Sequence, residues 1–425
     1  MTVKTLYPNV RPSFFNHFSK SKVLNPRFTY TRASSATYFD AVGALQEAVS
    51  NQPRFDYDPV TQTSLGLLIE EQRTNVVTNP RLLGAVAGTP GTQPTGFGSW
   101  NLSTSGLSIQ IVQSITYNNL TGVRYRLFGT AAATATVSNL FSPSSSGFTA
   151  SPGQNWTGSV FIAVASGLDT VNNFRLNTSA RAGGGTAGSS TSASLISSLS
   201  TTATRFSQTY TNLPGTTTGI AHQLLIGVTS GVAVDITFDV FGPQLEQGSC
   251  VTSLILPPGT TIAASTRSAD FLSISLSTMG VGTTGTCSLV WNGMLPQSAP
   301  SGINQNILQV DDASDNNRYL LRNDTSTSSI QLYRATSGSL TSAATVGAFT
   351  TRSQFKLGIT IDGVGGVVAS MNGASVVSQT GGPTSGLTTL RLGGSVAGDG
   401  LNGYIDRMAC YLEPVTNTQL EQLTK

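Results

Sequence analysis

Apolar and polar residues alternate with a period of two over most of this chain. The cleanest run covers residues 232–240, and shorter runs cover 107–111, 123–127 and 156–164. Such alternation is typical of a β-strand with one face in a core. Proline and glycine pairs such as that at 152–153 interrupt the runs. Many short strands with turns between them, and almost no helical period, predict a β-sandwich.

The last third of the chain repeats this pattern. Residues 355–361 alternate, and the Asp-Gly and Asn-Gly dipeptides at 362–363 and 372–373 favour hairpin turns, because both tolerate positive φ. Thr416 followed by Gln419 predicts a capping box for one short terminal helix. We therefore expect a second β-sandwich here. The Gly-, Ser- and Thr-rich stretch 182–198 is expected to be a mobile loop.

Composition indicates a protein that works within an assembly. The 425 residues are enough for two or three domains. Only 10% of them are charged, well below the ~25% of ordinary soluble domains. A surface of hydroxyls and amides suits a protein held among neighbours, where charge repulsion matters less. No run approaches ~18 consecutive apolar residues, so we expect no membrane insertion.

The N-terminus and the cysteines indicate synthesis in a reducing cytosol. Residues 1–10 are not followed by the apolar stretch of a signal peptide. Cys250, Cys287 and Cys410 are widely spaced and are expected to be small buried hydrophobic residues. Neither of the two histidines lies near a cysteine in sequence, so a zinc site is not expected.

The first forty residues are basic and rich in aromatic residues. Six cations precede the first acidic residue, Asp40, and they are Lys4, Arg11, Lys20, Lys22, Arg27 and Arg32. The aromatic residues between them are Tyr7, Phe14, Phe15, Phe18, Phe28 and Tyr30. An arm that docks on an acidic neighbour fits this pattern. Nucleic-acid binding uses the same residue types, but six cations over thirty residues make a weak patch.

Residues 31–75 contain three separated motifs in a fixed order. They are TRASSATY at Thr31–Tyr38, QPRFDYDP at Gln52–Pro59 and GLLIEEQRTN at Gly66–Asn75. This cassette resembles one found in virion proteins of tailed bacteriophages, which implies a place in a phage particle. Ion pairs among its arginines and glutamates are expected to orient the chain. The cassette either docks on the virion directly or connects domains, and the sequence leaves both open.

The docking prediction names specific residues. They are Arg11, Phe14, Phe15, Lys20, Lys22, Arg27, Glu70 and Arg73.

The middle region resembles the jelly-roll carbohydrate-binding modules of glycosidases and phage appendages. The resemblance covers residues 79–266 and is carried by residues 151–161 and 241–248. Trp156 falls on the apolar face of its strand and is expected in the core. Trp100, in a loop beside glycines, is the candidate for stacking on a sugar ring.

The last third resembles concanavalin A-like lectin domains of the laminin-G type. Residues 355–362, 371–373 and 401–406 carry this resemblance. It implies sugar contacts at one rim, for which the candidates are Tyr319, Arg322, Asn323 and Tyr333. It also implies a possible calcium site, and Asp311, Asp312 and Asp315, with Asp324 nearby, are hard oxygen donors in loop-like sequence. The competing interpretation is that these aspartates form turns.

The sequence offers no catalytic constellation. Asp235 and Asp239 share a strand face, but four residues separate their Cα atoms by ~13 Å, beyond the carboxylate spacing of ~5–9.5 Å in glycosidases. No Ser-His-Asp arrangement is evident. We therefore expect no catalytic residues, no enzyme activity and no cofactor other than possible calcium.

These observations predict an all-β chain of two antiparallel β-sandwiches, a jelly roll and then a concanavalin A-like domain, after an extended N-terminal docking arm. The predicted divisions are residues 1–78 for the arm and cassette, 79–266 for the jelly roll and 267–425 for the lectin-like sandwich.

The predicted function is structural and adhesive, as a tail fibre or similar appendage on the virion surface that binds host glycans. The chain would be made in the cytoplasm of the bacterial host and would assemble, as a homotrimer, with tail, portal or capsid proteins. No nucleic-acid partner is expected. A capsid-decoration or head-fibre protein is the first alternative, and a glycan depolymerase is the second.

Overall fold

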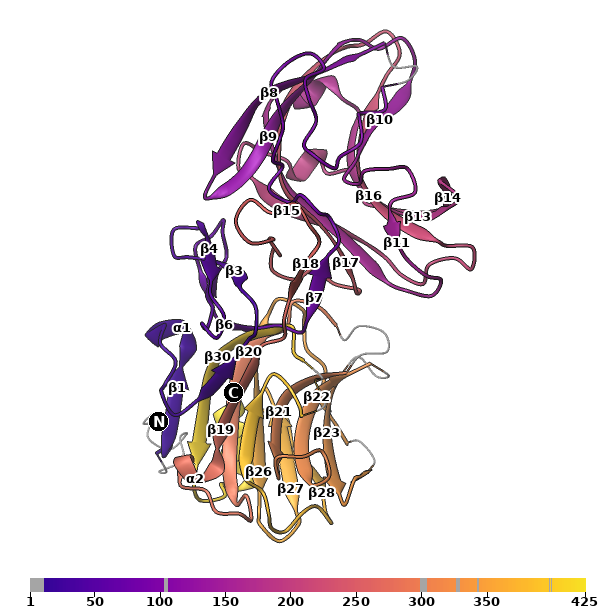
Figure 1. Ribbon diagram of the computed structural model, residues 1–425. Helices are drawn as coiled ribbons and strands as arrows, with labels where there is room; N and C mark the ends of the chain where they lie inside the picture. Colours follow the sequence, from indigo (N-terminus) through magenta and orange to yellow (C-terminus); the bar gives the residue numbers. More distant parts are fainter. Residues whose placement is uncertain are drawn as a thin grey trace. The chain divides into compact units, whose positions relative to one another are not determined.

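The computed structural model describes residues 11–102, 106–298, 304–325, 329–341, 344–396, 398 and 400–425 (Figure 1). The chain divides into two compact units. Unit 1 comprises Met1–Val42, Glu47–Gln72 and Ser268–Lys425, and unit 2 comprises Gly43–Gln46 and Arg73–Arg267.

Unit 1 is a sandwich of two antiparallel sheets. The first has the order β28 (Val377–Gln379), β27 (Val367–Met371), β26 (Gln354–Ile361), β20 (Cys287–Met294), β30 (Gly403–Tyr411), β6 (Ser64–Ile69) and β5 (Phe55–Tyr57), and β1 (Phe14–His17) pairs with β30. The second has the order β2 (Thr29–Thr31), β19 (Phe271–Ser275), β29 (Thr389–Leu392), β21 (Gln305–Asp311), β22 (Arg318–Asp324), β23 (Ser329–Thr336) and β24 (Ser339–Leu340), and β25 (Ala344–Gly347) pairs with β23. Trp291 of β20 and Leu390 of β29 belong to one buried core, which joins the two sheets.

The described part of the predicted docking arm is built into unit 1. In Figure 1 the indigo strand β1 lies beside β30, and the register pairs Phe14 with Cys410. β2 pairs with β19. The rings of Phe14 and Phe18 are buried and pack on Phe28, with centroid distances of 5.4 and 5.8 Å.

This arrangement differs from an extended arm because the apolar rings fill the edge of the unit 1 core. The predicted divisions at 78/79 and 266/267 therefore differ from the observed units, since residues 11–42 and 47–72 belong with the last third. Lys4 and Tyr7 of the predicted arm lie outside the described residues.

Unit 2 is a second sandwich of two antiparallel sheets. The first has the order β10 (Ala135–Leu140), β16 (Gly219–Val228), β13 (Asn173–Ala182) and β14 (Gly185–Thr191), and β11 (Phe148–Thr149) pairs with β16. The second has the order β15 (Thr204–Tyr210), β12 (Trp156–Ser166), β17 (Ala233–Gln247), β7 (Arg73–Asn75) and β18 (Ser265–Arg267), and it also holds β9 (Leu120–Thr130), which pairs with β17, and β8 (Ser108–Tyr117). Trp156 is buried in the core of this unit, which confirms its predicted place.

The predicted all-β fold of two antiparallel sandwiches is confirmed. The helices of the described residues are short and comprise α1 (Phe18–Ser21), α2 (Leu276–Met279) and α3 (Asn417–Thr424). The predicted capping box of Thr416 and Gln419 starts α3. β3 (Ala36–Phe39) and β4 (Leu45–Ala48) form a separate two-stranded sheet. The three cysteines are free and buried, as expected. Within the described part of the chain, no helix has the length and apolarity to cross a membrane.

Candidate functional site

The outer face of the five-stranded sheet of unit 2 carries a polar groove. The strands β10, β16 and β13 lie side by side and alternate between core and surface. Ile226 of β16 points into the core and is fully buried. Its neighbour Gly227 faces the opposite side and pairs with Thr136 on one flank and Asn173 on the other. Directly paired residues of an antiparallel sheet share a face, so these three form a row across the outer surface.

Gly227 brings no side chain to this row, and Asn172 and Asn173 occupy the space beside it. A Cβ atom at this position would lie 2.4 Å from Oδ1 of Asn172 and 2.8 Å from Cβ of Asn173. The groove at this row has a volume of about 390 Å³, within the ~300–1,000 Å³ of small-molecule sites. It is lined by Thr134, Ala135, Thr136, Asn172, Asn173, Arg175, Leu225, Gly227 and Val228.

Two polar atoms of the groove lack partners. Oδ1 of Asn173 and Nε of Arg175 are buried and make no hydrogen bond. A buried polar group without a partner costs about 1–3 kcal/mol. Because both atoms are buried, a ligand in the groove reaches the outer atoms of these side chains instead, which are Nδ2 of Asn173 and the terminal nitrogens of Arg175. The groove therefore favours a polar ligand that accepts hydrogen bonds.

Polar side chains extend from the groove along the same face. Two residues beyond Arg175, Asn177 donates to Oε1 of Gln223 at 2.8 Å and accepts from Oγ1 of Thr191 at 3.0 Å. These contacts cross β16, β13 and β14. The sheet therefore presents a continuous polar strip with the groove at one end.

The predicted stacking residues Trp100 and Tyr319 lie in the cores instead. Trp100 is 8% exposed and packs edge-on against Tyr125 and Phe238 at 5.6 and 5.8 Å. Tyr319 is 0% exposed, and its hydroxyl donates to the carbonyl oxygen of Pro383 at 2.9 Å. Neither ring offers a free face to a sugar. The loop of Trp100 is held against the sandwich because Asn101 forms a β-bridge with Ser138.

The structure brings Arg322 and Tyr333 together, and the two side chains contact each other. The guanidinium carbon of Arg322 lies 3.7 Å from the centroid of the Tyr333 ring. Both side chains also bind Oδ2 of Asp324, at 3.0 Å from Nε of Arg322 and 2.8 Å from the Tyr333 hydroxyl. Asn323 is fully buried and donates to Oε1 of Gln305 at 3.0 Å. These predicted sugar contacts therefore make internal bonds.

The aspartates of the predicted calcium rim also have internal partners. Asp311 is buried and pairs with Nε of Arg391 at 2.8 Å. Asp312 accepts from the backbone N–H of Ser314 at 2.9 Å, as in a turn. Asp315 pairs with Arg318. No group of three or more His, Cys, Asp or Glu residues in the described ranges is arranged to hold a metal ion. This arrangement agrees with the turn interpretation.

The predicted docking residues divide into buried and exposed members. Phe14, Glu70 and Arg73 are buried, and Arg73 donates to the carbonyl oxygen of Gln247. Lys22 is half-buried, with its ammonium 4.5 Å from the centroid of the Tyr57 ring. The exposed members are Arg11, Phe15, Lys20 and Arg27.

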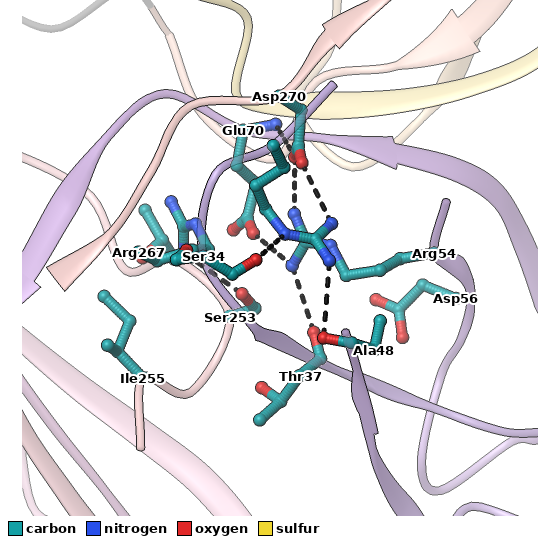
Figure 2. Close-up of polar contacts among 12 residues, drawn as sticks. Ser34, Thr37, Ala48, Arg54, Asp56, Glu70, Ser253, Ile255, Arg267 and Asp270 are labelled. Atoms are coloured by element: carbon teal, nitrogen blue, oxygen red, sulfur yellow. Dashed lines mark hydrogen bonds and ion pairs between the residues drawn. The ribbon is translucent and has the colours of Figure 1, made fainter. Parts of the chain in front are cut away.

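The three motifs of the cassette meet in a buried charge cluster of Arg32, Arg54, Glu70 and Asp270. Arg54 pairs with Glu70 at 2.8 Å and with Asp270 at 2.5 Å (Figure 2). Arg32 pairs with Asp270 at 3.2 Å. Each of the first three residues comes from a different motif. The sequence predicted ion pairs in the cassette but did not predict that they would be buried.

Burial and the two carboxylates act in opposite directions on Arg54. Burial lowers the pKa of Arg54, but the charges of Asp270 and Glu70 outweigh it and hold that pKa above its usual value. Buried ion pairs give little net stability, yet removal of one partner costs about 3–5 kcal/mol because it leaves a buried charge. The cluster therefore fixes the three motifs in one arrangement within unit 1.

Comparison with known proteins finds partial structural similarity. No protein family and no curated protein matches the sequence. One similar structure is the CBM40 module of a Ruminococcus gnavus sialidase, bound to α2,3-sialyllactose. The match covers 35% of this chain and 86% of that module, with a TM-score of 0.29 and 14% identity. Another is domain 4 of a Geobacillus stearothermophilus GH43 arabinanase, in complex with arabinotriose. The match covers 37% of this chain and 73% of that domain, with a TM-score of 0.31 and 16% identity.

A leech intramolecular trans-sialidase covers 35% of this chain, which spans only 24% of that protein, with a TM-score of 0.29 and 14% identity. Each of these similarities concerns about a third of the chain. The ligand of the groove has to be argued from its own residues.

Proposed function

We propose that this protein is a structural and adhesive component of a tailed-phage particle and binds host glycans in the groove of unit 2. The observation that carries the glycan part is a groove of about 390 Å³ lined by Asn173 and Arg175, whose side chains make no hydrogen bond among the described residues. A sugar offers hydroxyl groups that both donate and accept hydrogen bonds. Its oxygens therefore accept hydrogen bonds from the amide nitrogen of Asn173 and from the guanidinium of Arg175 together.

The floor of the groove adds an apolar contact. Leu225 pairs with Arg175 across β16 and β13 and is half-buried on the same face. The C–H face of a pyranose ring packs on such a side chain while its hydroxyls reach the flanking polar groups. Sites for small ligands commonly combine an apolar surface with a few placed polar groups.

The phage part of the proposal rests on the cassette. Its three motifs resemble those of tailed-phage virion proteins, and Arg32, Arg54 and Glu70 join them in one buried cluster. The cassette is thus a single structural element. The exposed cations Arg11, Lys20 and Arg27 stay available for an acidic neighbour. We place the chain on the virion surface as a tail-fibre-type homotrimer, in contact with tail, portal or capsid proteins.

We propose adhesion without catalysis, because the carboxylates of the polar strand face are each held by an arginine. Asp235 accepts two bonds of 2.7 Å from Arg126, and Asp239 accepts bonds of 2.7 and 2.8 Å from Arg124. The bonds from Arg126 hold the pKa of Asp235 below its usual value. A glycosidase acid needs the opposite, a raised pKa.

A glycan array with the full chain tests the binding proposal. Wild type should bind a defined set of host surface glycans, and Asn173→Ala should lose most of that signal. Thr216→Ala is the matched control, because Thr216 is exposed in a loop of the same unit. An array without any signal, or equal signals from all three proteins, would refute glycan binding in this groove.

Labelling of the protein on intact particles tests the phage proposal. A label on the tail supports the appendage, and a label on the head supports the decoration alternative. A protein absent from particles refutes both. Release of shortened products from host polysaccharide would instead establish the depolymerase alternative.

A further inference from the structure

We propose that the ligand of the groove is an acidic sugar, with its carboxylate on Arg175. This inference rests on the proposed glycan binding and names the chemical class of the glycan.

Arg175 differs from the other arginines of unit 2. This unit contains eight arginines, no lysine and four acidic residues. Among the described residues of the unit, Arg175 is the one arginine with no hydrogen bond, ion pair or ring contact. The others bind carboxylates, backbone carbonyls or hydroxyls, and they are Arg73, Arg81, Arg124, Arg126, Arg181, Arg205 and Arg267.

No contact within the described part of unit 2 therefore accounts for the position of the Arg175 side chain. Its side chain lines the groove. The other residues that line the groove are uncharged. The guanidinium is thus the single charge of the site and lacks a counter-charge there. A carboxylate supplies that charge and matches the planar donor fork of arginine with two parallel bonds.

The spacing of Asn173 and Arg175 fits a single sugar residue. Asn173 and Arg175 lie two positions apart on β13 and share its outer face. Their Cα atoms are thus separated by ~7 Å along the strand. A pyranose ring that carries a carboxylate spans this distance, with a ring hydroxyl accepting from Nδ2 of Asn173. Leu225 lies opposite Arg175 on β16 and offers the ring an apolar contact.

The charge of unit 2 favours the same ligand class. Eight arginines against four acidic residues make the unit positive. Such a field attracts anionic polysaccharides and weakens as salt screens it.

Matched sugar pairs test the inference by calorimetry on the full chain. Methyl glucuronide and methyl glucoside differ in the carboxylate at one carbon. Wild type should bind the glucuronide about tenfold or more tightly, as expected for one charge-assisted contact. Arg175→Gln should remove this preference, and Arg175→Lys should retain part of it. The preference should shrink between low and high salt.

Arg181→Gln is the matched control. Arg181 lies on the same face of β13, six residues away, and donates to Thr186. It should keep the wild-type preference, and melting curves of all variants check folding.

The outcomes separate this inference from the proposed function. Equal affinity for both sugars, unaffected by Arg175→Gln, overturns the acidic class and leaves glycan binding in place. A glucoside 6-sulfate that binds better than the glucuronide overturns the choice of a carboxylate. Failure of every sugar on the array and in calorimetry overturns both proposals.

Discussion

Replacement of Asp56 by asparagine should remove a pH dependence from the stability of unit 1. Asp56 lies on β5 and is buried. Its carboxylate accepts from the backbone N–H of Phe39 at 2.7 Å and from the hydroxyl of Tyr404 at 3.1 Å. Burial raises the pKa of Asp56 to about 6, although these bonds and the charge of Arg54 oppose the shift.

The size and sign of the effect follow from that pKa. A rise from 3.8 to about 6 corresponds to ~3 kcal/mol, at about 1.36 kcal/mol per pKa unit. The folded state holds its proton more tightly than the unfolded chain. The stability contributed by protonated Asp56 is therefore complete below pH 3.8 and is lost as the pH rises through about 6. Asparagine keeps an oxygen for the Phe39 N–H and carries no charge.

Hydrogen exchange between pH 4 and pH 8 measures this effect within unit 1. Peptides that cover Cys287–Met294 of β20 report its core. Relative to wild type, the free energy of unfolding of the Asp56→Asn variant should increase by up to about 3 kcal/mol as the pH rises over this range. Asp58→Asn, in the adjoining turn, is the control and should follow wild type. A difference between Asp56→Asn and wild type that is the same at every pH would refute the reasoning.

Three further predictions concern the buried groups of the two units. Arg54→Met should destabilise unit 1 by about 3–5 kcal/mol, because it removes the cation that the buried carboxylates of Glu70 and Asp270 share, although Arg32 still pairs with Asp270; a loss below about 1 kcal/mol in the same exchange experiment would contradict the cluster's role. Burial lowers the pKa of His222 from 6.5 to about 4, so the stability that neutral His222 contributes is complete above pH 6.5. The free energy of unfolding of unit 2 should therefore fall by up to about 3 kcal/mol as the pH falls to 4. Hydrogen exchange in β16 should show this loss in wild type and not in His222→Gln. Trp100→Ala should lower the free energy of unfolding of unit 2 by about 3–5 kcal/mol through lost packing, and selective loss of glycan binding at unchanged stability would contradict its place in the core.

The strands could be predicted from sequence because their signal is local. The alternation at 232–240 lies almost wholly within β17, which extends to residue 247. The pairing of β1 with β30 has no local signal, since Phe14 and Cys410 are nearly four hundred residues apart in the chain. The expected loop at 182–198 contains β14, which pairs with β13 through backbone bonds that small residues form without apolar side chains.

The candidate site was harder to predict because alternation does not say which aromatic side chains face outward. Aromatic chemistry alone favours Trp100 and Tyr319 as stacking residues, but both are core residues. The groove did leave a signal in the sequence. Asn173 and Arg175 alternate with Phe174 and Leu176, which are buried, so the polar pair had to share the opposite face. Only the structure shows that Gly227 lies between Asn173 and Thr136.

Equilibrium binding of host surface polysaccharide to the full chain tests the central claim most directly. Wild type and a double variant, Asn173→Ala with Arg175→Gln, are titrated side by side after their melting temperatures have been compared to check folding. The account predicts saturable binding to wild type and its loss in the variant. Binding that survives in the variant, or a wild type that binds no host polysaccharide, would contradict it.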